Sequence, residues 1–189
     1  MKILEIQIEN IRGIKNISIS PNGENVVVFG PNGSGKSAIV DAIEFLLAGR
    51  ISRLEGEGTK NLSLKEHGPH VDYRDRLKDV NVKAKIKIND FNQIIEIERK
   101  MSSYKKLTIT PKEAEYSLKP YLDIAEMGQH VLSRREILKY ITAEAGKRAK
   151  EIQSLLNLEK IEAMRGVLVA VQNNAEKESK LSKSNLEIA

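Results

Sequence analysis

The sequence contains no cysteine, few aromatic residues and no long apolar run. Without cysteine it can form neither a disulfide framework nor a thiolate metal site, which fits a reducing cytoplasm. No apolar stretch approaches the roughly 18 residues that a membrane span requires, and the mixed N-terminus does not resemble a signal peptide. We therefore expect a soluble, cytoplasmic protein with no membrane partner.

Charged residues make up 30% of the 189 residues and aromatic residues only 4%. That composition favours long solvated helices, and the length suffices for one domain with an appendage. The net charge of +5 results from 31 Lys and Arg against 26 Asp and Glu. This charge permits contact with nucleic acid but does not require it.

Alternating apolar and polar residues predict antiparallel strands in the first half of the chain. Residues 2–9 alternate clearly and residues 14–19 follow after a turn, so we expect the chain to open with a β-hairpin. Three later segments predict a β-meander: 80–88, 93–99 and 107–109. The continuous β-branched run 25–29 instead predicts a strand buried on both faces in the middle of a sheet.

Helices are predicted in three regions. Residues 36–48 are apolar almost all round, which predicts a buried helix that Gly49 ends. After Pro111 we expect breaks at Pro120 and Gly128, with helices over three segments: 112–119, 133–144 and 146–157. Residues 50–79 show no clear period and are expected to form a loop with a short element.

From Leu158 onward one long helix can run towards the C-terminus. Apolar residues recur there at spacings of three and four, as in the seam of a coiled coil: Ile161, Met164, Leu168, Val171 and Ala175. A seam this short is also found in ordinary packed helices. The position at the end of the chain favours a coiled coil.

Residues 30–37, Gly-Pro-Asn-Gly-Ser-Gly-Lys-Ser, match the phosphate-binding pattern G-x-x-x-x-G-K-[ST]. Backbone N–H groups can form an anion-binding nest at the start of the following helix. Lys36 would reach the β- and γ-phosphates, and the Ser37 hydroxyl would ligate magnesium. A turn that merely connected two elements would not need Lys-Ser after its last glycine. The motif predicts a site for ATP and Mg²⁺ with these further nucleotide-binding residues: Asn32, Gly33, Ser34, Gly35 and Ala38.

Two parts of a hydrolytic site are missing from this sequence. No run of four apolar residues ends in Asp, as a second magnesium-binding strand requires, and no Leu-Ser-Gly-Gly signature is present. Phosphoryl transfer needs such a complete clamp around the nucleotide. We therefore expect a longer chain or a second polypeptide to supply the remainder.

The chain resembles the N-terminal head lobe of the SMC and double-strand-break-repair (Rad-type) ATPases, a branch of the ABC ATPases. Four features give the resemblance: Ile8–Gly13, the phosphate-binding loop, Asp41–Ile43 and an outgoing helix. The resemblance implies an α/β P-loop NTPase lobe with an antiparallel β-meander and a helical subdomain. It places the ATPase head lobe at 1–157 and the start of the coiled coil at 158–189.

In this family the C-terminal lobe returns after a long coiled coil and supplies the missing motifs. The resemblance therefore implies an ATPase that is active only with that lobe, head-to-head dimerisation with ATP, and action on DNA in repair, chromosome maintenance or defence. It also implies a nuclease partner. A non-hydrolysing module that senses nucleotide for assembly is the main alternative, and a transporter-type ABC ATPase subunit is a weaker one.

The resemblance also assigns roles to individual residues. Arg12 matches an arginine beside the nucleotide, although an exposed cation at a hairpin tip is the alternative. Gln129 matches a glutamine that holds magnesium and positions the attacking water, unless Arg134 occupies that position. Asp41 is expected to serve helix structure. A lysine face at 83, 85 and 87 can meet a DNA backbone or simply be solvated.

Overall fold

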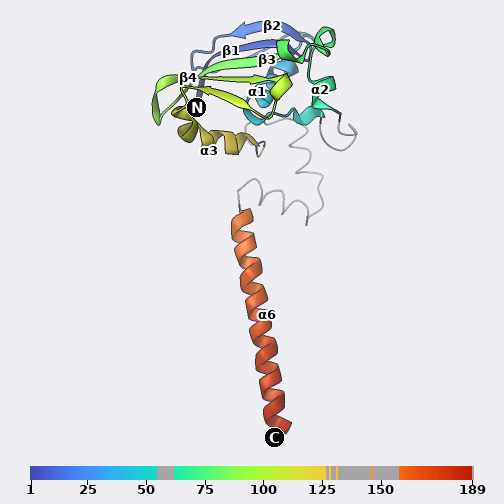
Figure 1. Ribbon diagram of the computed structural model, residues 1–189, viewed down its shortest axis with the longest axis vertical. Coiled ribbons are helices and arrows are strands. Elements are labelled where there is room, and N and C mark those ends of the chain that lie inside the picture. Colours follow the sequence, from blue (N-terminus) through green and yellow to red (C-terminus); the bar gives the residue numbers. More distant parts are fainter. Residues whose placement is uncertain (55–61, 127, 129–130, 132–145, 147–157, 189) are drawn as a thin grey trace. The chain divides into compact units, whose positions relative to one another are not determined.

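The computed structural model describes residues 1–54, 62–126, 128, 131, 146 and 158–188 (Figure 1). By its contacts the chain divides into two units, Met1–Val131 and Leu132–Ala189, and we describe each by itself. The helices predicted over 133–144 and 146–157 lie outside the described residues, apart from Gly146. The boundary predicted between head lobe and outgoing helix remains a prediction.

The first unit is built on one five-stranded antiparallel sheet with the order β2-β1-β3-β4-β5. Its strands are β1 (Lys2–Ile11), β2 (Ile14–Ile19), β3 (Asn81–Ile88), β4 (Phe91–Lys100) and β5 (Leu107–Thr110). The predicted opening hairpin is confirmed by the pairing of β1 with β2. The predicted meander is confirmed by the pairing of β3, β4 and β5 in sequence order.

Period-2 alternation gives the sheet one apolar and one charged face. The apolar face buries these residues: Ile6, Ile8, Val82, Ala84, Ile86, Ile95 and Ile97. Two helices contact the sheet, α1 (Lys36–Ala48) and α3 (Ala114–Glu126), and they also contact each other (Figure 1). Phe45 and Leu46 of α1 are almost fully buried. The helix that follows the phosphate-binding loop is thus part of the main core, as predicted.

The end of α1 is fixed by a glycine and by a buried arginine. Gly49 adopts a left-handed φ of 69°, and its N–H donates to Phe45 O at 2.9 Å. A Cβ there would lie 2.8 Å from the Tyr104 carbonyl oxygen, so only glycine fits. From β4, the Arg99 guanidinium donates to the Leu46 carbonyl at 2.8 Å and to the Leu47 carbonyl at 3.2 Å. The helix stop predicted at Gly49 is confirmed.

Short helical turns occupy much of the region between α1 and β3, where we expected a loop. They are η1 (Ser52–Leu54), α2 (Leu64–His67), η2 (Val71–Tyr73) and η3 (Leu77–Asp79), and η4 (Met101–Ser103) follows β4. Pro69 forms an isolated bridge with Ile11, and the Arg12 N–H donates to Gly68 O at 2.8 Å. This region therefore packs against the end of the first hairpin.

The buried strand predicted at 25–29 is wrong for this structure. These residues form no strand, and Val27 is 85% exposed and Phe29 91% exposed. A strand buried on both faces needs packed layers on both sides of its sheet. The described sheet consists of β1 to β5, and residues 25–29 pair with none of these strands.

The break predicted at Pro120 is also wrong, because α3 continues from Ala114 to Glu126 through the proline. Proline removes one backbone hydrogen bond inside a helix. Leu118 and Ala125, on either side of it, are buried at 0% and 1% exposure. Packing against the core holds both halves of the helix despite the lost bond. The break predicted at Gly128 agrees with its left-handed φ of 76°, just after α3.

The described part of the second unit is a single long helix, α6 (Glu159–Ile188). The helix predicted from Leu158 onward is confirmed. Its predicted seam is exposed, with Met164 at 68% and Leu168 at 70%. The coiled coil itself remains a prediction.

Candidate nucleotide-binding site

The loop at residues 30–35 depends on glycines at its tight positions. Gly33 and Gly35 adopt left-handed φ values of 84° and 88°, which other residues rarely tolerate. A Cβ on Gly30 would lie 3.1 Å from Ser34 Oγ. The loop backbone therefore folds tightly on itself, and the spacing of glycines in the motif reflects that geometry.

Helix α1 begins directly at the end of this loop. Its first residue is Lys36, its N-cap is Gly35, and no side chain caps it. The first N–H groups of a helix have no partner within the helix and form the positive end of its dipole. One of them, the Ala38 N–H, already donates to Gly35 O at 2.9 Å. The donors left for a phosphate at the start of α1 are therefore the preceding N–H groups, those of Lys36 and Ser37.

Lys36 spans the loop with its side chain. Its ammonium nitrogen donates to Gly30 O at 2.8 Å and to Pro31 O at 2.6 Å. These bonds hold a positive charge above the loop backbone. The lysine and the helix start therefore place positive charge together, a donor set that suits a polyphosphate.

The residues present fit ATP with magnesium. Ser37 lies in the first turn of α1 and is exposed, so its hydroxyl is accessible to a cation. The described residues hold no cluster of three or more His, Asp or Glu side chains that could bind a metal alone. A magnesium ion here would depend on Ser37 and on the phosphates themselves. Asn32, Gly33 and Ser34 are exposed around the loop.

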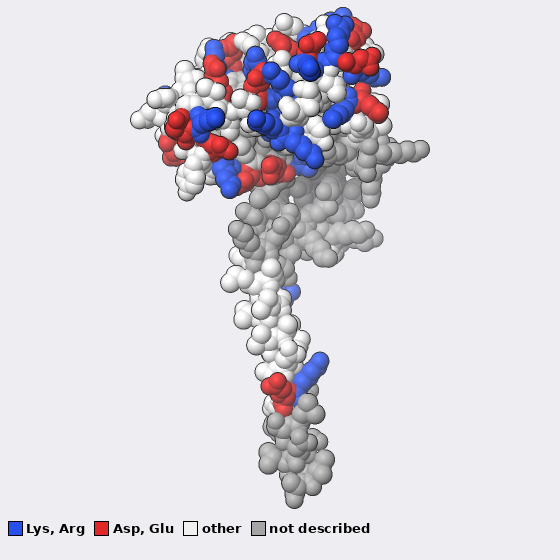
Figure 2. All heavy atoms as spheres, viewed as in Figure 1, with Lys and Arg blue, Asp and Glu red and all other residues white. Residues whose placement is uncertain are grey.

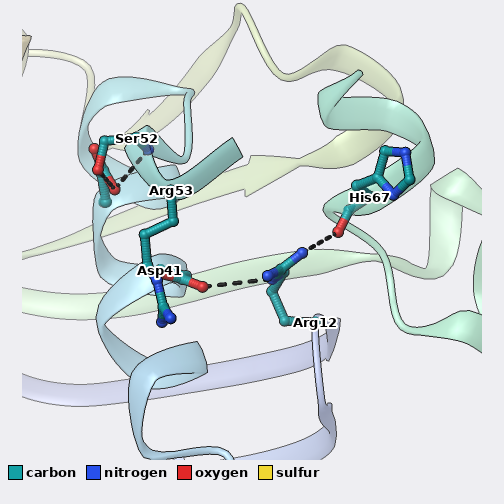
Figure 3. A network of polar contacts seen from close by, with 6 residues as sticks. Arg12, Asp41, Ser52, Arg53 and His67 are labelled. Atoms are coloured by element: carbon teal, nitrogen blue, oxygen red, sulfur yellow. Dashed lines mark hydrogen bonds and ion pairs between the residues drawn. The ribbon is translucent and has the colours of Figure 1, made fainter. Parts of the chain in front are cut away.

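Arg12 does not extend freely from the hairpin tip, and Figure 3 shows it between Asp41 and the backbone of His67. Its Nε lies 3.4 Å from Asp41 Oδ2, and its Nη1 donates to His67 O at 2.7 Å. Its backbone has a left-handed φ of 52°, which is uncommon for a residue other than glycine. The structure shows that Arg12 pairs with Asp41 on α1. Its assignment as a nucleotide contact remains a prediction.

Glu44 is a buried carboxylate that we did not single out from the sequence. It is 3% exposed and accepts hydrogen bonds from the Ser52 N–H and hydroxyl, each at 3.0 Å. Burial raises the pKa of Glu44, and the bonds from Ser52 offset part of that effect. The only sequence signal was a charged residue within a mostly apolar helix.

We predict that the Glu44→Gln variant changes how the free energy of unfolding depends on pH. The raised pKa means that the folded state binds the Glu44 proton more tightly than the unfolded state, whose pKa is about 4.3. Wild type should therefore lose stability relative to the variant as pH rises through that value and the higher folded one. Urea unfolding from about pH 4 to 7 measures the difference. An increase with pH would contradict the prediction.

Several predicted residues lie elsewhere. Gln129, Arg134 and His130 are outside the described residues, so the magnesium role of Gln129 remains a prediction. His67 lies at the end of α2, and His70 caps η2 by accepting from the Asp72 N–H at 3.2 Å.

The predicted lysine face lies on the outer side of the sheet, and two of its lysines form ion pairs with acidic residues. Lys83 lies 3.4 Å from Glu98 on β4, and Lys85 lies 3.0 Å from Glu5 on β1. Figure 2 shows acidic and basic side chains interspersed across the visible face of the first unit. These ion pairs favour the solvated-face interpretation over a phosphate-binding surface.

The sequence matches the AAA domain family over residues 5–189. It is 40% identical over 62 residues to structural maintenance of chromosomes protein 1 of Arabidopsis thaliana, which covers 32% of this chain and 5% of that protein. It is 40% identical over 50 residues to the DNA replication and repair protein RecF of Chlorobium phaeobacteroides, covering 26% and 14% respectively. The chain therefore spans only a small part of these relatives.

The fold is similar to that of a chain from a structural study of ATP-driven dimerization and DNA-stimulated activation of SMC ATPases. The TM-score is 0.55 at 18% identity, and the match covers 82% of this chain and 99% of the other. None of the helices in the described segments combines the length and apolar character needed to cross a membrane. The chain belongs to the AAA domain family, and its fold is similar to that of an SMC ATPase.

Proposed function

We propose that this chain binds Mg²⁺ and ATP and forms half of a composite ATPase, whose other half is a C-terminal lobe. The most direct support comes from the glycine loop, from the Lys36 side chain that bonds to its carbonyls, and from the uncapped start of α1 at its end. The backbone N–H groups and the Lys36 ammonium group would hold the phosphates in place. Magnesium, when bound, would neutralise charge between the β- and γ-phosphates.

The exposed segment before the loop supports the need for a second lobe. Val27 and Phe29 are 85% and 91% exposed directly beside the phosphate-binding loop. Fully burying one such side chain contributes about 1.5–3 kcal/mol. Burial of this segment under strands of a further lobe would therefore be favourable. The same lobe would bring the missing acidic motif and the signature motif to the nucleotide.

The biological setting that we propose is action on DNA through ATP-driven pairing of two heads. The relatives named above include a chromosome-maintenance protein and a replication and repair protein. In the proposed cycle, ATP held by each head closes the pair and hydrolysis opens it. The ion pairs of Lys83 and Lys85 argue that DNA contact uses another surface. We also propose a nuclease partner, because the family resemblance implies one.

ATP turnover tests the composite site. The isolated chain should bind ATP weakly in the presence of magnesium and hydrolyse essentially none, whereas mixing with its natural C-terminal lobe should produce phosphate release. Appreciable turnover by the isolated chain would contradict the two-lobe proposal. A stable complex of both lobes with ATP but without turnover would instead support the non-hydrolysing sensing module.

A further inference from the structure

A buried carboxylate on α1 gathers two arginines from separate parts of the chain. The Asp41 side chain is 2% exposed, with Arg12 Nε at 3.4 Å and Arg53 Nη1 at 3.7 Å. Arg12 comes from the turn between β1 and β2, and Arg53 comes from η1 after the helix (Figure 3). Both cations reach the same carboxylate from outside the helix.

Packing alone does not explain a carboxylate at this position. Burial raises the pKa of Asp41, although both arginines oppose that effect. A buried ion pair is often no more stabilising than apolar residues of similar volume. Glu44, one turn further along α1, uses its carboxylate for the neutral donors of Ser52. Asp41 instead meets guanidinium groups, so its charge fixes where those groups lie.

This arrangement lies close to the phosphate-binding loop. Asp41 follows Ser37 by four residues, which places both on the same side of α1 about 6 Å apart along its axis. The end of the first hairpin also reaches the loop, since Ile14 Cγ1 would be 3.7 Å from a Cβ on Gly35. Two guanidinium groups against one carboxylate leave an excess positive charge beside the loop.

We propose that Asp41 is a positioning residue for nucleotide binding, which holds Arg12 and Arg53 beside the phosphate-binding loop so that their positive charge favours a polyphosphate. The inference rests on the proposed function and extends it to Asp41 and Arg53, which do not belong to the motif and were not assigned to the nucleotide from the sequence. The His67 carbonyl holds the other side of Arg12, so the loss of Asp41 would release one of two restraints on that guanidinium.

Asp41→Asn tests the inference, because it removes the charge and keeps the size. Its affinity for ATP with magnesium should fall about 5- to 30-fold, the effect of losing one or two kcal/mol. Glu44→Gln, which neutralises the other buried carboxylate of α1, is the matched control and should bind ATP as wild type does. In an Arg12→Ala background, Asp41→Asn should have a clearly smaller effect than in wild type, since the two residues act together.

The outcomes separate the inference from the proposed function. If wild type does not bind ATP, or if Lys36→Ala does not weaken binding, the proposed function fails. If both of those hold, three results for Asp41→Asn would still contradict the inference. The variant binds ATP like wild type, it binds ATP more tightly, or it lowers the affinity by the same factor in the Arg12→Ala background as in wild type.

A second pair of variants covers the case in which circular dichroism shows that Asp41→Asn does not fold. Arg12→Lys and Arg53→Lys keep the charge but lose the planar guanidinium that pairs with the carboxylate. We expect each to lower ATP affinity severalfold. Unchanged affinity in both would overturn the inference.

Discussion

Replacing Lys36 with alanine is expected to weaken the binding of ATP with magnesium by about 10- to 150-fold, because a hydrogen bond to a charged group contributes about 1.5–3 kcal/mol. The ammonium group already lies over the loop, bonded to Gly30 O at 2.8 Å and Pro31 O at 2.6 Å. Under the proposed function it needs little movement to reach a phosphate. Lys36 therefore supplies a positive charge that is already in position, and no other side chain of the motif carries one.

Equilibrium titration with a fluorescent ATP analogue measures this effect. Lys112→Ala removes an exposed lysine from the turn before α3 and serves as the control. The melting temperature of Lys36→Ala should stay close to that of wild type, because the bonds of Lys36 are exposed. Affinity within twofold of wild type would show that the loop does not hold phosphate as proposed.

The Arg99→Met variant is expected to lower the free energy of unfolding by about 3–5 kcal/mol, because three carbonyl acceptors lose their charged donor. Arg99 is 6% exposed and donates to three carbonyls: Leu46, Leu47 and Tyr104. Methionine fills similar space but leaves these acceptors unpaired, and each unpaired group costs about 1–3 kcal/mol. Burial lowers the pKa of Arg99, yet arginine stays charged at neutral pH.

Urea unfolding followed by circular dichroism gives that free energy. Arg74→Met, at an exposed position between η2 and η3, is the control and should change it by less than about 0.5 kcal/mol. A loss below about 1 kcal/mol for Arg99→Met would mean that water or other groups donate hydrogen bonds to the carbonyls at the end of α1 in place of Arg99.

Local patterns were sufficient to predict much of this fold. The alternation in β3 and β4 predicts strands because one face of that sheet is buried and the other is not. The phosphate-binding motif predicts the start of α1, and Gly49 predicts its end. In each case the signal and the structure lie within a few residues of each other. Comparison with relatives then confirmed the family.

Features that depend on distant partners could not be predicted in this way. Arg99 is 53 residues from Leu46, whose carbonyl it binds, and nothing local to β4 identifies that acceptor. The run at 25–29 has the composition of a central strand, but composition does not supply the strands on either side of it. Pro120 stays inside α3 because the core packs Leu118, a tertiary effect that outweighs local helix preference.

Arginines from two other parts of the first unit contact α1 at two points. Arg12 pairs with Asp41 in the middle of the helix, and Arg99 from β4 donates to the carbonyls of its last turn. Its 13 residues span about 20 Å. A partner that displaced β4 is therefore expected to move the C-terminal end of α1, the helix whose N-terminal end follows the glycine loop.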